Sequence, residues 1–130
     1  MLVESDKSNR EKGFTLLEVL IAISIFSIGI LAVGTMQISA IKGNASARTH
    51  TEAATWAADR VERLMALPYT HADLAQGNHN APNEGIYAIS WTVTDDTPIT
   101  NTKTVAVIVT WNARGANRSV SMQHVIPQIL

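Results

Sequence analysis

One carboxylate stands near the start of a long apolar run, and its setting implies chemistry more strongly than that of any other side chain. The run, GFTLLEVLIAISIFSIGILAVGTMQISAI, extends from Gly13 to Ile41 and contains Glu18. An ionised carboxylate near hydrocarbon is costly unless it meets a partner. Glu18 is therefore a candidate functional residue, and ion pairing in a setting of low polarity is the chemistry expected of it.

Other candidate sites are weaker. The histidines are scattered along the chain at His50, His71, His79 and His124. Asp73 lies near His71 and His79, where a loop metal site is one interpretation and solvated loop residues are the simpler one. Asp95 and Asp96 precede a Thr-Pro pair, which is ordinary turn chemistry, and we expect no calcium there.

Composition and motifs exclude several classes of protein. The sequence has no nucleophile elbow, phosphate-binding loop or acid pair whose spacing implies catalysis. It has no cysteine, and its net charge of -1 gives no basic patch for nucleic acid. Its 130 residues, 46% of them hydrophobic, leave one small domain of about 80 residues beyond the leader and the apolar run. We predict a protein without catalytic residues, cofactor, metal or nucleic-acid partner.

The apolar run is long enough to cross a membrane. From Val19 to Ile41 it has no charged side chain, and it exceeds the roughly 20 apolar residues that span a bilayer core. A cleavable secretory signal is the alternative, but its apolar region is shorter and ends in a small-x-small site. The segment Ile38-Ser39-Ala40 matches such a site poorly.

Basic residues set the expected orientation. Lys7, Arg10 and Lys12, together with the amino terminus, outnumber Lys42 and Arg48 at the other end of the run. Because cytoplasmic flanks carry the excess of positive charge, the leader is expected in the cytoplasm. The domain after Ile41 then lies outside the inner membrane.

A second helical pattern follows the apolar run. Residues 42–67 keep a helical period, and their apolar stripe consists of Ala54, Ala57, Ala58, Val61, Leu64 and Met65. Asp59 and Arg63 are spaced for an ion pair, and Pro68 ends the helix. Since no proline interrupts residues 14–67, the two halves are expected to form one rod of about 80 Å. Gly43 and Asn44 are its weakest point.

Period-two alternation then predicts a small antiparallel sheet. After a loop over residues 68–85, three strands are expected at about 87–94, 105–111 and 118–126. Their apolar face needs a cover, and the stripe of the second helical half is the natural one. Trp91 and Trp111 are expected to fill the core between sheet and helix. The predicted fold class is α+β, a long amino-terminal helix packed on about three antiparallel strands.

The segment GFTLLEVLIAISIF resembles the prepilin motif of type IV pilins and pseudopilins. It has a glycine, then an aromatic residue, and then an acid four residues later in an apolar helix. The resemblance implies a pilin fold, with prepilin peptidase cleaving between Gly13 and Phe14 and N-methylating Phe14. It further implies an assembly role for Glu18. The domains expected are a cleaved leader (1–13), a transmembrane and filament-core helix (14–41), an amphipathic half (42–67) and a β head (68–130).

The new amino terminus gives Glu18 a partner. After cleavage, the amine of Phe14 lies about one helical turn from Glu18, and in a bundle the amine of one subunit can meet the carboxylate of another. Pairing would offset the cost of burial. The alternative is that Glu18 only reaches the cytoplasmic headgroups. Trp56 lies opposite the apolar stripe on a helical wheel, so it either contacts a neighbouring subunit or packs under the loop after Pro68.

Within the family, AATWAADRVERLMALPY and VIVTWNARG are similar to PilV-type minor pilins, and less so to the I-type minor pseudopilin of type II secretion. The small head without a cysteine pair and the apolar helix without proline favour a minor subunit. The resemblance implies prepilin peptidase, other pilin or pseudopilin subunits, the inner-membrane assembly machinery and lipid as partners. The protein would move from the inner membrane to the pilus at the cell surface. A third class is an uncleaved, signal-anchored periplasmic binding module.

Overall fold

A single helix forms the amino-terminal half of the chain. The computed structural model describes residues 13–129, and all of the predicted leader (1–13) except Gly13 lies outside them. Helix α1, Leu16–Met65, continues through Gly29, Gly34 and Gly43 and ends just before Pro68. The chain divides into two compact units between Gly43 and Asn44, the predicted weak point of the helix. We call the described part of the second unit, residues 44–129, the head.

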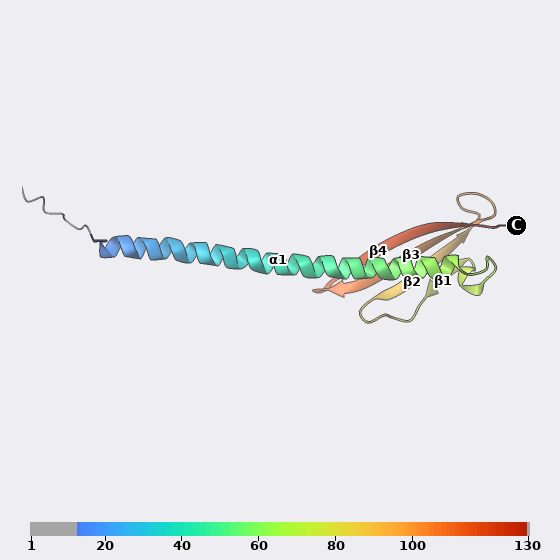
Figure 1. Cartoon of the computed structure of the whole chain (residues 1–130). Helices are drawn as coiled ribbons and strands as arrows, with labels where there is room; N and C mark the ends of the chain where they lie inside the picture. Colours follow the sequence, from blue (N-terminus) through green and yellow to red (C-terminus); the bar gives the residue numbers. More distant parts are fainter. Residues whose placement is uncertain (1–12, 130) are drawn as a thin grey trace, which may run out of the picture. The chain divides into compact units, whose positions relative to one another are not determined.

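The head is a sheet of four antiparallel strands in the order β1-β2-β3-β4, with the last turns of α1 on one face (Figure 1). The strands are β1, Gly77–Asn80; β2, Ala88–Asp95; β3, Thr102–Ala113; and β4, Ala116–Pro127. A short 3-10 helix, η1, Ala72–Leu74, precedes β1. The predicted α+β architecture is confirmed, whereas the expected number of about three strands is wrong by one.

The additional strand, β1, has no apolar alternation, so its sequence reads as loop. Its residues, Gly-Asn-His-Asn, are polar and are held at the edge of the sheet by pairing with β2. The ring of His79 stacks on Trp91 with a centroid distance of 5.4 Å, and Thr92 Oγ1 donates to Asn78 Oδ1 at 2.8 Å. Pairing and side-chain contacts with β2 therefore define this strand, rather than its own pattern.

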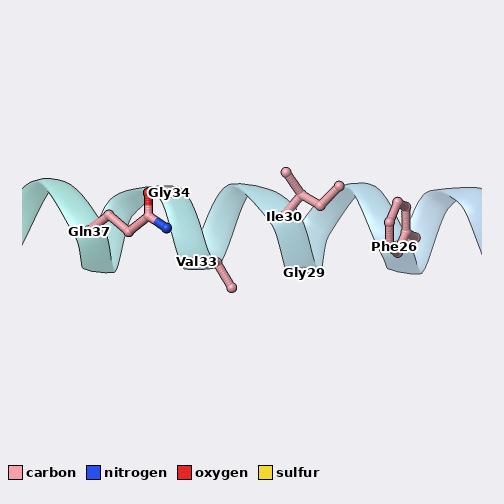
Figure 2. Close-up of a pocket in the computed structure, with 6 residues that line it drawn as sticks. All are labelled: Phe26, Gly29, Ile30, Val33, Gly34 and Gln37. Atoms are coloured by element: carbon pink, nitrogen blue, oxygen red, sulfur yellow. The ribbon is translucent and has the colours of Figure 1, made fainter.

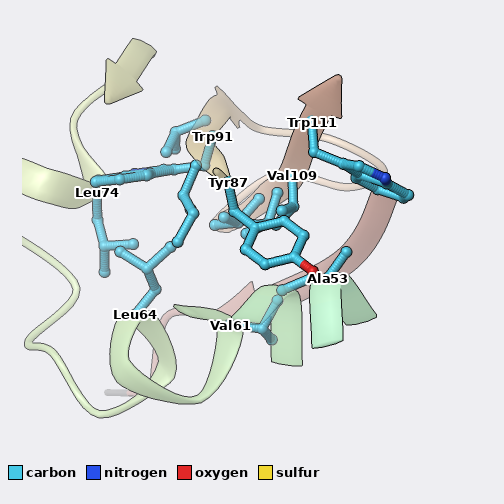
Figure 3. Packing of buried hydrophobic residues seen from close by; sticks show 13 residues of the cluster. Ala53, Val61, Leu64, Leu74, Tyr87, Trp91, Val109 and Trp111 are labelled. Carbon is cyan, nitrogen blue, oxygen red and sulfur yellow. The ribbon is translucent and has the colours of Figure 1, made fainter. Parts of the chain in front are cut away.

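The core lies between α1 and the inner face of the sheet (Figure 3). Trp91 and Trp111 are buried there, as predicted, together with alternate residues of β2 and β3. The helix contributes Ala53, Ala57, Val61 and Leu64. Three residues of the predicted stripe are not part of the core: Ala54 is half-buried, and Ala58 and Met65 are exposed. The stripe was placed slightly off the true contact face, because alanines occupy several neighbouring positions of the helix.

The turn between β3 and β4 is shorter than the gap between the strands predicted at about 105–111 and 118–126. The strands continue to Ala113 and Ala116, so that Arg114 and Gly115 alone form the connection. Both have positive φ, 54° and 78°, which matches the twist of a two-residue hairpin and explains a glycine at position 115. Gly115 N also donates to Asn112 Oδ1 at 3.1 Å.

Candidate functional site

Glu18 lies in the first turn of α1, and Thr15 caps that turn. The backbone N–H of Glu18 donates to Thr15 Oγ1 at 3.2 Å, so the segment Thr-Leu-Leu-Glu forms one half of a capping box. The unpaired N–H groups of a helix start favour a negative charge nearby. Helix geometry therefore stabilises the carboxylate of Glu18 independently of any partner. The T-x-x-E spacing could have predicted this cap from sequence.

The surroundings of Glu18 are apolar and open. Phe14 is 83% exposed, and Glu18 is also exposed. A shallow groove along this face is lined by Phe14, Glu18, Val19, Ala22, Ile23 and Phe26. Among the described residues, Glu18 makes no ion pair. The carboxylate thus lies within an apolar helix face that a second apolar helix could cover.

The same face continues toward the middle of the apolar segment (Figure 2). Phe26 and Gln37 bound a groove that also includes Ile30 and Val33, and its floor is formed by Gly29 and Gly34. A Cβ built at either glycine meets nothing within 4 Å. Because glycine has no side chain, the backbone of a neighbouring helix can approach closely at these positions. Small residues at the interface are common where helices associate in lipid.

Three hydroxyl groups in this segment are satisfied within the helix. Ser24 and Ser27 donate to the carbonyls of Leu20 and Ile23 at 2.8 and 2.7 Å. Thr35 donates to the carbonyl of Ala32 at 2.7 Å. Because no hydroxyl of these three needs water, the segment is chemically suited to hydrocarbon.

No residue of 13–129 covers the apolar part of α1. The exposed large side chains include Leu20, Ile25, Phe26, Leu31 and Met36. By length and composition, α1 is the one helix of residues 13–129 that could cross a membrane. A continuous surface of this kind marks an interaction with lipid or protein.

Residues 8–34 match the prokaryotic N-terminal methylation motif. The methylation motif includes the positions of Gly13, Phe14 and Glu18, and it supports a type IV pilin-like protein, a class of structural subunits. Together with the uncovered apolar helix, the methylation motif supports membrane anchoring. No curated protein and no solved structure matched the chain in the same comparisons.

The remaining sequence candidates are dispersed over the head. Trp56 is half-buried and packs against the core, so it does not lie fully opposite the packed face as the helical wheel indicated. Its contact with a neighbouring subunit stays a prediction. His71 Nδ1 accepts from the N–H of Asp73 at the start of η1, and His79 lies on Trp91. Among the described residues, no three His, Asp or Glu side chains form a group that could hold a metal.

The acidic turn is occupied by contacts of its own. Asp95 Oδ1 lies 3.2 Å from Lys103 Nζ, and Asp96 Oδ1 accepts from the N–H of Asn101 at 2.9 Å. Lys103 is buried and also donates to the carbonyl of Leu74 at 2.7 Å. Leu74 is completely buried. These contacts fix the segment around η1 to the sheet, an anchor that sequence analysis missed.

A second anchor joins α1 to β2. Tyr87 Oη donates to Glu52 Oε2 at 2.9 Å, and Arg48 Nε lies 2.9 Å from Glu52 Oε1. Hydrogen bonds from Arg48 and then Tyr87 lower the pKa of Glu52. Burial, followed by the hydrogen bond to Glu52, raises the pKa of Tyr87. The network ties the first turns of the helix in the head to the start of the sheet.

Proposed function

We propose that the protein is a minor pilin of a type IV pilus, a non-catalytic structural subunit that takes part in pilus assembly. The observation that carries the proposal is the methylation motif at the start of an apolar helix that the described residues leave uncovered. In the membrane, lipid covers that helix. In a filament, the helices of other subunits replace the lipid, so the same surface serves as anchor and as filament core.

Processing by prepilin peptidase is the first step of the proposal. Cleavage between Gly13 and Phe14 would release the leader and create a cationic amine, which is then methylated. Phe14 is exposed at the start of the helix, and the Cβ of an alanine at position 13 would meet no atom within 4 Å. A residue larger than glycine is therefore tolerated by the fold, and the need for glycine falls on the peptidase.

Assembly is the second step, and Glu18 directs it. The carboxylate lies in an apolar groove, where burial against another subunit costs free energy unless a cation enters with it. The amine of Phe14 on a neighbouring subunit is that cation. Correct pairing then favours one register between adjacent helices. Other pilin subunits and the inner-membrane assembly machinery are the partners of this step.

A deletion strain distinguishes this proposal from its alternatives. Loss of surface pili with normal protein secretion, restored by the gene in trans, is the expected result. Loss of secretion with normal piliation would instead assign the chain to a type II secretion pseudopilus. Normal piliation and secretion, with a full-length chain retained in the membrane, would indicate an uncleaved periplasmic binding module.

A further inference from the structure

One end of the head carries a groove with two arginines. The groove lies between residues 45–49 of α1 and the turn that joins β3 to β4. Ser46 and Thr49 line the helix side, and Arg114 and Arg118 line the hairpin side. The remaining lining residues are alanines, so that little besides the two guanidinium groups determines the chemistry of this groove.

The strand pattern explains why the cations gather there. Along β4, Val120 and Met122 face the core, and Arg118 is the next residue of that face toward the turn. Arg118 is paired with Trp111, the last buried residue of β3. The inner face of the sheet therefore changes from apolar to cationic where the core ends. Arg114 follows in the turn itself.

Neither arginine is neutralised within the described part of the chain. Arg114 and Arg118 are exposed, and none of the ion pairs or hydrogen bonds formed by side chains of residues 13–129 involves their guanidinium groups. Glu52, one helical turn beyond Thr49, is already bound by Arg48 and Tyr87. Two unpaired like charges in one groove favour the binding of an anion.

Charge is distributed unevenly along the head. Asp95 and Asp96 lie where β2 ends, which is the opposite end of the sheet from the β3–β4 turn (Figure 1). The loop before β2 lies at the arginine end, and it contributes Glu84 together with Ile86, which is 61% exposed. Exposed apolar and cationic side chains thus occur at the same end, beside the one acid Glu84, and apolar and cationic groups together are the combination found where proteins meet anionic membrane surfaces.

The covalent chain keeps this end of the head near the membrane. Ala45, a lining residue, follows Ile41 by four residues, which span at most about 14 Å of extended chain. Lys42 lies within that short connection. This limit holds for any orientation of the head. The groove therefore remains within reach of the headgroups that surround the end of the apolar run.

We propose that the groove binds the phosphate of an anionic phospholipid headgroup while the protein is anchored in the membrane. Guanidinium groups form paired hydrogen bonds to phosphate oxygens, and two arginines can hold one phosphate from two sides. Ile86 adds an apolar contact with the acyl boundary. The inference rests on the membrane-anchored state of the proposed function, and it adds a lipid ligand for the head.

The test uses the full chain in lipid nanodiscs and measures hydrogen exchange of a peptide that contains residues 113–118. The readout is the ratio of exchange rates in phosphatidylcholine discs to those in discs that contain phosphatidylglycerol. We expect slower exchange with phosphatidylglycerol, so that the ratio exceeds one. R114Q or R118Q should each lower the ratio about fivefold or return it to one. R63Q, at the far end of the helix, should leave the ratio unchanged. R114K and R118K keep the charge but lose the paired hydrogen bonds, so they should lower the ratio less than R114Q and R118Q do.

Equal exchange in the two lipids, or a ratio unaffected by R114Q and R118Q, would overturn the proposal. Inorganic phosphate added to phosphatidylcholine discs is expected to have no effect; slower exchange there would identify a free anion as the ligand instead. Co-elution of the chain with the discs separates this inference from the proposed function. If the chain does not enter discs, anchoring itself fails, whereas entry without a lipid effect refutes only the headgroup site.

Discussion

At the scale of single residues, two substitutions can separate the proposed assembly role of Glu18 from its place in the helix cap. Its backbone N–H donates to Thr15 Oγ1, and its side chain is of the type that can accept from the N–H of Thr15 and so complete a capping box. Glutamine suits the same position of a capping box but carries no charge. Comparison of Glu18→Gln with Glu18→Ala therefore distinguishes the charge from the cap.

We expect both E18Q and E18A to be processed and inserted into the membrane, and both to enter filaments several-fold less than the wild type. The physical reason is that neither side chain can pair with the amine of a neighbouring Phe14. The measurement is the amount of each variant in sheared pili relative to the membrane fraction. Incorporation of E18Q at the level of the wild type would show that the charge has no assembly role.

Tyr87 and Glu52 form the residue-scale link that responds to pH. Tyr87→Phe removes the hydrogen bonds from Tyr87 Oη to Glu52 and to the carbonyl of Thr49, and should lower the free energy of unfolding by about 1 kcal/mol at neutral pH. The measurement is denaturant unfolding of the wild type and of Y87F across pH.

The lowered pKa of Glu52 and the raised pKa of Tyr87 set the pH ranges in which each group stabilises the fold. Because the pKa of Glu52 is lowered in the fold, its contribution is present above its ordinary value of 4.5 and is lost as pH falls through the folded pKa. Because the pKa of Tyr87 is raised, its contribution is complete below 10.0 and is lost as pH rises through the folded pKa. Y87F should weaken the fall of the free energy of unfolding at acid pH but not abolish it, because the ion pair of Glu52 with Arg48 remains. It should also remove the loss of stability at alkaline pH that is due to Tyr87. Identical pH profiles would refute the link.

At the scale of elements, the face that α1 presents to the sheet is one point on which sequence and structure differ. Leu64 is 2% exposed and its neighbour Met65 is 48% exposed. Leu64→Ala should lower the free energy of unfolding of the head by about 2–5 kcal/mol, because it leaves a cavity in the core. Met65→Ala, the matched control, should change it by about 0.5 kcal/mol or less. A larger loss of unfolding free energy for Met65→Ala than for Leu64→Ala would show that Met65 belongs to the packed face, as the sequence predicted.

Elements with a strong apolar periodicity could be predicted from sequence. Elements that exist only through contacts with other parts of the fold could not. Helix α1 and strands β2 to β4 follow from apolar periodicity, as does the burial of Trp91 and Trp111. Strand β1 has no such pattern, because pairing with β2 and the stacking of His79 on Trp91 create it. Likewise, Lys103 lies before the strand predicted at about 105–111, and its burial depends on the carbonyl of Leu74, which only the fold brings within hydrogen-bond distance.

The candidate site was largely accessible from sequence because it is local. Gly13, Phe14 and Glu18 lie within six residues, so their spacing alone defines the motif. The cationic groove was not accessible in this way. It joins the helix after Asn44 to a turn about seventy residues later, and only the hairpin register brings Arg118 to the helix side.

At the scale of the whole molecule, the two units differ in what stabilises them. Every member of the buried core belongs to the head, whereas the large apolar side chains of residues 14–41 are exposed. A chain truncated to begin at Asn44 should therefore fold and remain soluble. Far-ultraviolet circular dichroism and a cooperative thermal transition check this. A non-cooperative or aggregating fragment would mean that the head depends on the apolar segment.

The central claim is that a membrane anchor becomes a filament subunit through cleavage at Gly13, and the mass of the native amino terminus tests it most directly. Mass spectrometry of the chain from its own membranes and filaments should give a peptide that begins with N-methylated Phe14. The G13A variant, which the fold accommodates, should retain the leader and be absent from filaments. A native chain that begins before Gly13, or an unmodified Phe14 in the filament fraction, would contradict the account.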